Sequence, residues 1–272
     1  LKVAIHTPVV EVSSVDEAFL DLTGSVRLFE SREAVSRTIK AAVAKRFGLS
    51  CSIGIAPNKL LAKLASGLKK PDGLVILLPE DISRLLEDLP IRKLCGIGPA
   101  LEKQLNVMGI ETCGQLGRTP VELLAHRFGV TGFKLHEMGR GLDNAPVIPL
   151  NQAPEAKSIG HSMTLERDLS NHRKIESVLF HLAEMVGQRA RRENLQGTRI
   201  TVTFRYIDFE TFSRQASLPK PSRDGIEIFQ AAQKILHFTR LEQPIRLAGV
   251  SLFNLIQDPK QETLFDDYQR RA

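Results

Sequence analysis

Long apolar runs are missing from this sequence of 272 residues, and cysteine is scarce. No apolar run approaches the roughly 18 residues that a membrane-spanning helix needs, so we expect no membrane partner. No charged and apolar leader of the secretory type opens the chain, which favours a cytoplasmic protein. The three cysteines are an odd number without metal-ligand spacing, so we expect a reducing compartment and no disulfide framework. The seven histidines also lack the spacing of metal ligands.

Positive charge exceeds negative charge in two separate blocks of the chain, and the formal net charge is +6 at pH 7. Residues 1–77 carry 11 basic against 7 acidic side chains, and residues 151–260 carry 16 against 12. A polyanion held from two sides would need such a distribution. Two solvated basic faces would give the same counts, so charge alone favours nucleic acid without establishing it.

Two adjacent carboxylates, Asp16 and Glu17, stand at the mouth of an apolar strand predicted near the start of the chain. Two charges there are costly without a compensating cation, so the pair predicts a metal site. The alternative is a solvated strand end. Side chains alternate along a strand, so both carboxylates can reach one cation only where the backbone leaves strand geometry, as beside Ser13 and Ser14.

The first 78 residues alternate between strand and helix patterns. Apolar residues recur with a helical period in residues 31–47 and 59–68. Strands are predicted at residues 49–55 and 74–78, and a proline-glycine turn separates the second helix from the last strand. The order is strand, strand, helix, strand, helix, strand, which is an α/β unit without its beginning.

From residue 79 to about residue 140 the pattern changes to short helices separated by glycine and proline. Within this segment, Gly96 and Gly98 flank one apolar residue, apolar residues follow at helical spacing, and a Gly-Ile pair closes the pattern. This arrangement is typical of a helix-hairpin-helix, whose tight turn directs backbone N–H groups to a phosphate beside a helix N-terminus. The alternative is a plain helical turn.

A new pattern begins after a proline-containing linker at residues 144–156. Residues 157–257 predict strand, helix, strand, strand, helix, strand, the split βαβ arrangement with both helices on one face of a four-stranded sheet. In the strand predicted at residues 198–207, alternation turns one set of side chains to the helices and the other to the bare face. The apolar set is Ile200, Val202, Phe204 and Tyr206, and the polar set is Arg199, Thr201, Thr203 and Arg205.

Basic and hydroxyl side chains on an uncovered sheet face suit contact with the sugar-phosphate backbone of a nucleic acid. An ordinary solvated face is the alternative. Arg214 and Arg246 on neighbouring strands favour nucleic acid.

Several of these segments resemble, in order and spacing, the motifs of the Y-family (translesion) DNA polymerases, most closely their bacterial DNA polymerase IV branch. The segments are residues 14–21, 52–63 and 70–73, the hairpin glycines, and residues 157–160. The resemblance covers almost the whole chain and implies an α+β protein of several domains. These would be a partial α/β palm (1–78), a small all-α thumb with the helix-hairpin-helix (79–145), a linker (146–156), a β-α-β-β-α-β little finger (157–257) and a tail (258–272).

The resemblance implies a template-directed, error-prone DNA polymerase with two Mg²⁺ ions, acting on primer-template DNA and deoxynucleoside triphosphates. Asp16 and Glu17 would be the catalytic metal ligands, and Lys70 would neutralise the incoming triphosphate. Contacts with DNA are implied for Ser14, Lys63, Gly96, Gly98, Ser158, Arg199, Arg205 and Arg246.

In this comparison, the family's first motif lies upstream of Leu1, and it supplies a third carboxylate. The fingers also lie upstream of Leu1. We therefore expect a monomeric fragment that does not polymerise DNA alone. In the tail, Gln261, Leu264 and Phe265 resemble the peptide with which bacterial polymerases bind the sliding clamp.

Two other functions remain open from the sequence. One is a non-catalytic, DNA-binding adaptor tethered to the sliding clamp, although such an adaptor has no use for the carboxylates. The other is a generic helix-hairpin-helix DNA-binding protein, which explains the thumb but not the carboxylate strand.

Overall fold

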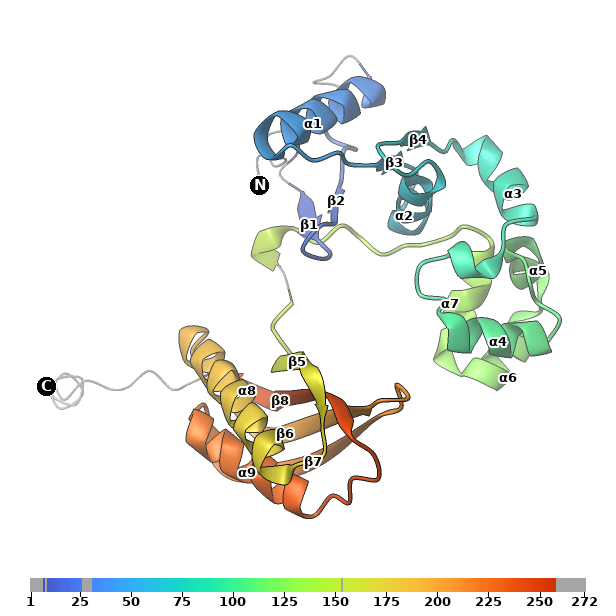
Figure 1. The fold of residues 1–272 in the computed structure, drawn as a ribbon. Coiled ribbons are helices and arrows are strands. Elements are labelled where there is room, and N and C mark those ends of the chain that lie inside the picture. The colour runs from blue at the N-terminus through green and yellow to red at the C-terminus, as the bar shows by residue number, and fades with distance from the viewer. Residues whose placement is uncertain (1–6, 8, 26–30, 153, 258–272) are drawn as a thin grey trace, which may run out of the picture. The chain divides into compact units, whose positions relative to one another are not determined.

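The computed structural model describes residue 7 and residues 9–25, 31–152 and 154–257 (Figure 1). The chain divides into two compact units, residues 1–153 and residues 154–272. No helix within the described ranges is long and apolar enough to cross a membrane.

An antiparallel hairpin opens the described part of the first unit and carries the two carboxylates in its loop. Strand β1 (Val10–Val12) pairs with strand β2 (Ala18–Leu20). In the loop between them, the backbone N–H groups of Ser13 and Ser14 both donate to the carbonyl oxygen of Glu17, at 2.9 and 3.2 Å. This loop is the departure from strand geometry that the sequence predicts beside the two serines.

The rest of the α/β pattern follows in the predicted order: α1 (Arg32–Phe47), β3 (Ile53–Ile55), α2 (Lys59–Leu68) and β4 (Leu74–Ile76). Strands β3 and β4 are parallel, with Ile53 opposite Leu74. β3 is shorter than the predicted strand 49–55, because β4 offers only three residues to pair with it. Helix α2 begins where the side-chain oxygen of Asn58 accepts a hydrogen bond from the Leu61 N–H.

Short helices fill residues 79–139, as the spacing of glycine and proline predicts. They are α3 (Pro79–Glu87), the 3₁₀ helix η3 (Ile91–Lys93), α4 (Pro99–Val107), α5 (Cys113–Arg118), α6 (Val121–Phe128) and α7 (Val130–Gly139). Helices α3 and α4 each begin with proline, which tolerates the first helical position because the N–H that it lacks would be unpaired there. Gly132 lets α7 approach α6, since a Cβ atom there would lie 2.3 Å from the backbone of Leu124.

One hydrophobic cluster runs from α2 through the short helices. Leu61 of α2, Leu105 of α4 and Leu124 of α6 are fully buried within it. The boundary predicted at residue 78 therefore crosses a continuous core, and the separation of palm and thumb stays a prediction.

The start of the predicted linker is fastened to the hairpin and to α2. The Glu11 carboxylate accepts hydrogen bonds from Lys59 Nζ at 2.7 Å and from the Ile148 N–H at 2.8 Å. Lys59 Nζ also donates to the carbonyl oxygen of Pro146 at 3.2 Å. Burial alone would raise the pKa of Glu11, but these hydrogen bonds outweigh it and hold the pKa below its ordinary value. A 3₁₀ helix, η4 (Leu150–Gln152), follows.

The second unit has the predicted order of elements: β5 (Ser158–Leu169), α8 (His172–Arg192), β6 (Leu195–Tyr206), β7 (Thr211–Ser222), α9 (Gly225–His237) and β8 (Ile245–Gln257). The sheet order is β5-β8-β6-β7, and all neighbouring strands are antiparallel. Strand β8 thus separates β5 from β6, which is the split arrangement that the sequence predicts. Both helices lie against one face of the sheet (Figure 1), so the α+β fold class is confirmed.

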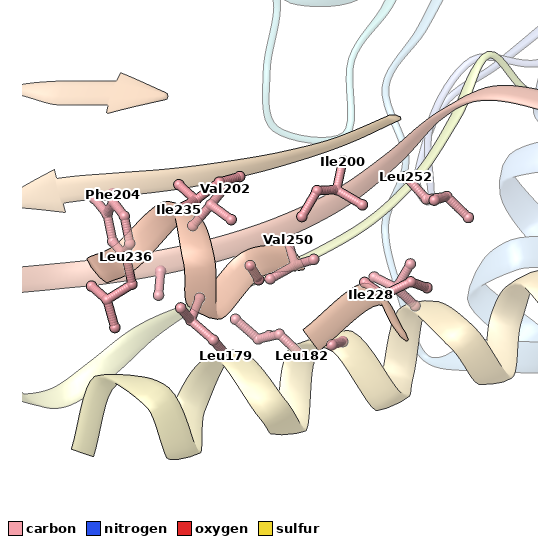
Figure 2. Packing of buried hydrophobic residues seen from close by; sticks show 14 of the residues in the cluster. Leu179, Leu182, Ile200, Val202, Phe204, Ile228, Ile235, Leu236, Val250 and Leu252 are labelled. Atoms are coloured by element: carbon pink, nitrogen blue, oxygen red, sulfur yellow. The ribbon is translucent and has the colours of Figure 1, made fainter. Parts of the chain in front are cut away.

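The core of the second unit lies between this sheet and its two helices. Figure 2 shows Leu179 and Leu182 of α8 beside the side chains of β6, which include the fully buried Phe204. The four apolar residues of β6 that the alternation assigns to the helices are all buried: Ile200, Val202, Phe204 and Tyr206. Because burying one large apolar side chain stabilises a fold by about 1.5–3 kcal/mol, this layer dominates the stability of the unit.

Two polar residues differ from the sequence prediction for the other face of the sheet, which we call the open face. Arg214 pairs across the strands with Val202, a core residue, so its register places it on the helix side of the edge strand β7. Thr201 lies in register with the open face, but it is only 7% exposed. Arg214 therefore gives no support to a basic open face, and Thr201 is not available at its surface.

Candidate functional site

The loop of residues 13–17 holds Asp16 exposed and ionised. The Ser14 hydroxyl donates a hydrogen bond to Asp16 Oδ1 at 2.7 Å, and the Asp16 N–H lies 3.4 Å from the Ser14 oxygen. The hydrogen bond from Ser14, with smaller contributions from the positive charges of Lys63 and Lys70, lowers the pKa of Asp16. Ser14, predicted as a DNA contact, therefore supports the neighbouring carboxylate in this structure.

Glu17 forms an ion pair with Lys63 of α2. The sequence predicts a DNA contact for Lys63 and not this pairing. A signal was nonetheless present, because Glu11 and Glu17 flank the hairpin loop while Lys59 and Lys63 lie one turn apart on α2, and each glutamate pairs with one lysine.

Lys63 also lines a surface groove together with the predicted hairpin glycines. The groove lies between α2 and the turn before α4, and it includes Gly96, Gly98 and the basic side chains of Arg92 and Lys93. The structure thus brings three predicted DNA-contacting residues to one surface, and the Glu17 ion pair connects that surface to the carboxylate loop.

The hairpin turn itself has the backbone that the two glycines predict. Gly96 has a φ of +101°, a conformation that residues with a side chain rarely adopt, and Gly98 is the N-cap residue of α4. No side chain caps the N-terminus of α4, so its first N–H groups have no side-chain acceptor. Such groups can bind an anion like phosphate.

In the second unit, register places three predicted DNA contacts on the open face. Ser158 of β5 and Arg199 of β6 both pair with Phe253, so they lie in one row across the sheet. Arg205 lies further along β6, where its Nε donates to the Thr211 hydroxyl at 2.8 Å. Arg246 differs from these, because it sits at a shift in the β6–β8 register and its guanidinium lies 4.8 Å from the ring centre of Phe209.

Lys70 is exposed and lies in the turn that connects α2 to β4. Its positive charge is the smallest of the causes that lower the pKa of Asp16. The predicted clamp-binding residues Gln261, Leu264 and Phe265 lie outside the described residues, and so does the chain before residue 7.

Three family models match separate parts of the chain. The model of the impB/mucB/samB family covers residues 3–67, that of the DNA polymerase-iota thumb domain covers residues 92–143, and that of the impB/mucB/samB family C-terminal domain covers residues 156–264.

Curated relatives match almost the whole chain. DNA polymerase IV of Moorella thermoacetica is 40% identical over 98% of this chain and 67% of its own length. DNA polymerase IV of Pelotomaculum thermopropionicum is 37% identical over 97% of this chain and 66% of its own length. The chain thus spans about two thirds of the length of these relatives. A solved Y-family DNA polymerase chimera superposes with a TM-score of 0.77 at 26% identity, covering 93% of this chain and 73% of the chimera.

Matches of this extent identify the class as the DNA polymerases. Within that class, the chain belongs to the Y family, and the curated relatives cited above carry the name DNA polymerase IV.

Y-family DNA polymerases use divalent metal ions, and the donor atoms of the loop fit such ions in kind. Asp16 and Glu17 supply carboxylate oxygens, which hard divalent cations prefer. No group of three or more histidine, cysteine, aspartate or glutamate side chains that could hold a metal ion occurs within the described ranges.

Proposed function

We propose that this chain supplies the metal-binding carboxylates, thumb and little finger of a template-directed, error-prone translesion DNA polymerase. The loop of residues 13–17 carries this proposal. It presents Asp16, exposed and with a lowered pKa, beside Glu17, and it lies within the electrostatic reach of Lys63 and Lys70. An adaptor that only binds DNA has no use for a carboxylate held in its charged form.

Asp16 and Glu17 would serve as carboxylate ligands for the two Mg²⁺ ions. When bound, such ions stabilise the attacking and leaving oxygens of nucleotidyl transfer. Ser14 donates the hydrogen bond that lowers the pKa of Asp16, and Lys70 would neutralise the phosphates of the incoming deoxynucleoside triphosphate. Because Lys63 pairs with Glu17 in this structure, metal binding by Glu17 would compete with that ion pair.

Two carboxylates are fewer than the three that the family pattern supplies. The third belongs to a motif that precedes, in the family, the residues matched here. We therefore expect that the 272-residue chain by itself binds DNA but does not extend a primer.

Primer-template DNA would contact both units through its phosphates. In the first unit, the groove combines Lys63, Arg92 and Lys93 with Gly98, where α4 begins without a side-chain cap. In the second unit, Arg199 and Arg205 stand on the open face. Contacts of this kind hold a duplex without reading its sequence, as a polymerase requires.

The tail would bind the sliding clamp through Gln261, Leu264 and Phe265. We expect the double variant Leu264→Ala/Phe265→Ala to lose clamp binding in a pull-down with purified clamp. Unchanged binding would contradict this assignment and leave the polymerase proposal intact.

Primer extension tests the proposed function. The protein that the gene encodes is assayed with Mg²⁺ and a primed template as wild type, Asp16→Asn and Asp21→Asn. Asp21 is the matched control, because its carboxylate, close in sequence to the loop, is engaged by Thr23, whose N–H donates to Asp21 Oδ1 at 2.8 Å. We expect Asp16→Asn to lose at least about 100-fold in rate, and Asp21→Asn to retain it.

Both variants should bind primed DNA like the wild type. Wild-type extension by Asp16→Asn would overturn the assignment of the metal site. A wild-type protein that binds DNA and clamp but extends no primer would favour the adaptor function.

A further inference from the structure

The ammonium group of Lys40, in α1, contacts three oxygens from two other segments. Its Nζ donates to the carbonyl oxygen of Cys51 at 2.6 Å and to that of Asp72 at 2.8 Å, and it also pairs with the Asp72 carboxylate. An ammonium has three donor hydrogens, so each finds an acceptor. The Lys40 side chain is only 19% exposed, and these contacts therefore fix its position.

The contacts join α1 to the turn that carries Lys70. Asp72, two residues after Lys70, has a φ of +54°, which is uncommon for a residue other than glycine. Lys40 binds both the carbonyl and the carboxylate of this one residue. A single side chain from a distant helix therefore holds the turn in a conformation that its own backbone disfavours.

Two further hydrogen bonds are formed by Gly73, the last residue of the same turn. The Gly73 N–H donates to the Ser52 hydroxyl at 3.2 Å, and the Ile53 N–H donates to the Gly73 carbonyl oxygen at 2.9 Å. The second of these bonds belongs to the chain's approach to β3 and β4 and would survive the loss of Lys40. Lys40 thus holds Asp72 at both its carbonyl and its carboxylate oxygens.

We propose that Lys40 is a positioning residue for nucleotide binding, which holds the turn of residues 70–73 so that Lys70 faces the incoming triphosphate. This inference rests on the role of Lys70 in the proposed function. Lys40 itself is engaged by protein oxygens and does not contact the nucleotide. Its loss should weaken nucleotide binding through Lys70, and should affect the chemical step and DNA binding little.

A double-mutant cycle in primer extension tests this inference on the protein that the gene encodes. The variants are Lys40→Met, Lys70→Ala and the combination, with Lys45→Met as the control on the exposed side of α1. We expect Lys40→Met to raise KM for the nucleotide about tenfold, because small misplacements of a binding group have effects of this size. We expect kcat and the Kd for DNA to stay within about threefold.

In the Lys70→Ala background, Lys40→Met should raise KM no further, because coupled residues are non-additive. Lys40→Arg should restore part of the wild-type KM. Asp72→Asn, which replaces an exposed partner of Lys40, serves as a second route should Lys40→Met not fold, and it should raise KM in the same Lys70-dependent way.

Two results would overturn the inference, and they differ in what else they affect. A wild-type KM in Lys40→Met and Asp72→Asn, or an increase that persists without Lys70, would contradict the role of Lys40 alone. A wild-type KM in Lys70→Ala would contradict the role of Lys70 and remove the basis of the inference with it.

Discussion

The carboxylate loop of residues 13–17 and the open face of the sheet are held in place by different kinds of interaction. The loop depends on side chains from distant segments, since Glu17 pairs with Lys63, 46 residues away. On the open face, Arg199 and Arg205 both lie on β6, a strand of 12 residues that pairs with β7 on one side and β8 on the other. A single side-chain change should therefore disturb the loop, whereas the open face should tolerate one.

The same contrast separates the two faces of strand β6. Phe204 is fully buried between the sheet and the helices, while Arg199 on the other face is exposed. Stability should depend on the first residue and nucleic-acid binding on the second.

The largest effect on stability is expected from the core of the second unit. Phe204→Ala should lower the free energy of unfolding by about 3–5 kcal/mol, because it leaves a cavity among fully buried side chains. Chemical denaturation followed by far-UV circular dichroism measures this loss.

Arg199→Ala is the matched control on the same strand and should change the free energy of unfolding by less than about 0.5 kcal/mol. Equal losses in the two variants would show that the faces of β6 are not divided as described.

A smaller effect is expected on DNA binding. The double variant Arg199→Ala/Arg205→Ala should weaken binding to primed DNA, and it should reduce the slope of log affinity against log salt by about 1 for each arginine that contacts a phosphate. Fluorescence anisotropy over a salt series measures this slope. Lys174→Gln, which also removes a positive charge but lies in α8 on the other side of the sheet, should not reduce it.

The smallest effect is expected on the pKa of Asp16 in the loop of residues 13–17. Because Ser14 donates to the Asp16 carboxylate, Ser14→Ala should raise the pKa of Asp16 towards the ordinary value for an aspartate. A lowered pKa stabilises the fold above the pKa of the unfolded chain, and this contribution disappears as pH falls through the folded pKa. The variant should therefore take up its proton at higher pH.

A pH titration by carboxyl ¹³C NMR measures the pKa of Asp16 in this variant. Ser13→Ala is the control, because only the backbone of Ser13 takes part in the loop's hydrogen bonds. An unchanged pKa of Asp16 in Ser14→Ala would show that the hydrogen bond from Ser14 does not cause the lowered pKa.

The sheet domain was predictable because its signals are local. Period-two alternation in β6 assigned Phe204 and its apolar neighbours to the core, and those residues are buried. Alternation could not reveal that Arg214 pairs with Val202, because register depends on which residues of β6 and β7 lie opposite each other.

For the carboxylate site, the sequence predicted which residues belong to it but not which side chains they pair with. Asp16 and Glu17 could be found as adjacent charges in an apolar segment. The pairing of Glu17 with Lys63, and the hold of Lys40 on Asp72, join residues 46 and 32 positions apart. Such pairs depend on how the hairpin, α1 and α2 pack together, and the spacing of the glutamates and lysines alone does not settle which of them meet.

The most direct test of the metal site is the binding of Mn²⁺ in place of Mg²⁺, followed through paramagnetic broadening of backbone amide NMR signals. In the protein that the gene encodes, broadening should centre on residues 13–17 and extend to Lys63. The variant Asp16→Asn/Glu17→Gln should lose it, while Asp21→Asn should keep it. Broadening that persists in the double variant, or that centres on other carboxylates, would contradict the assignment of this loop as the metal site.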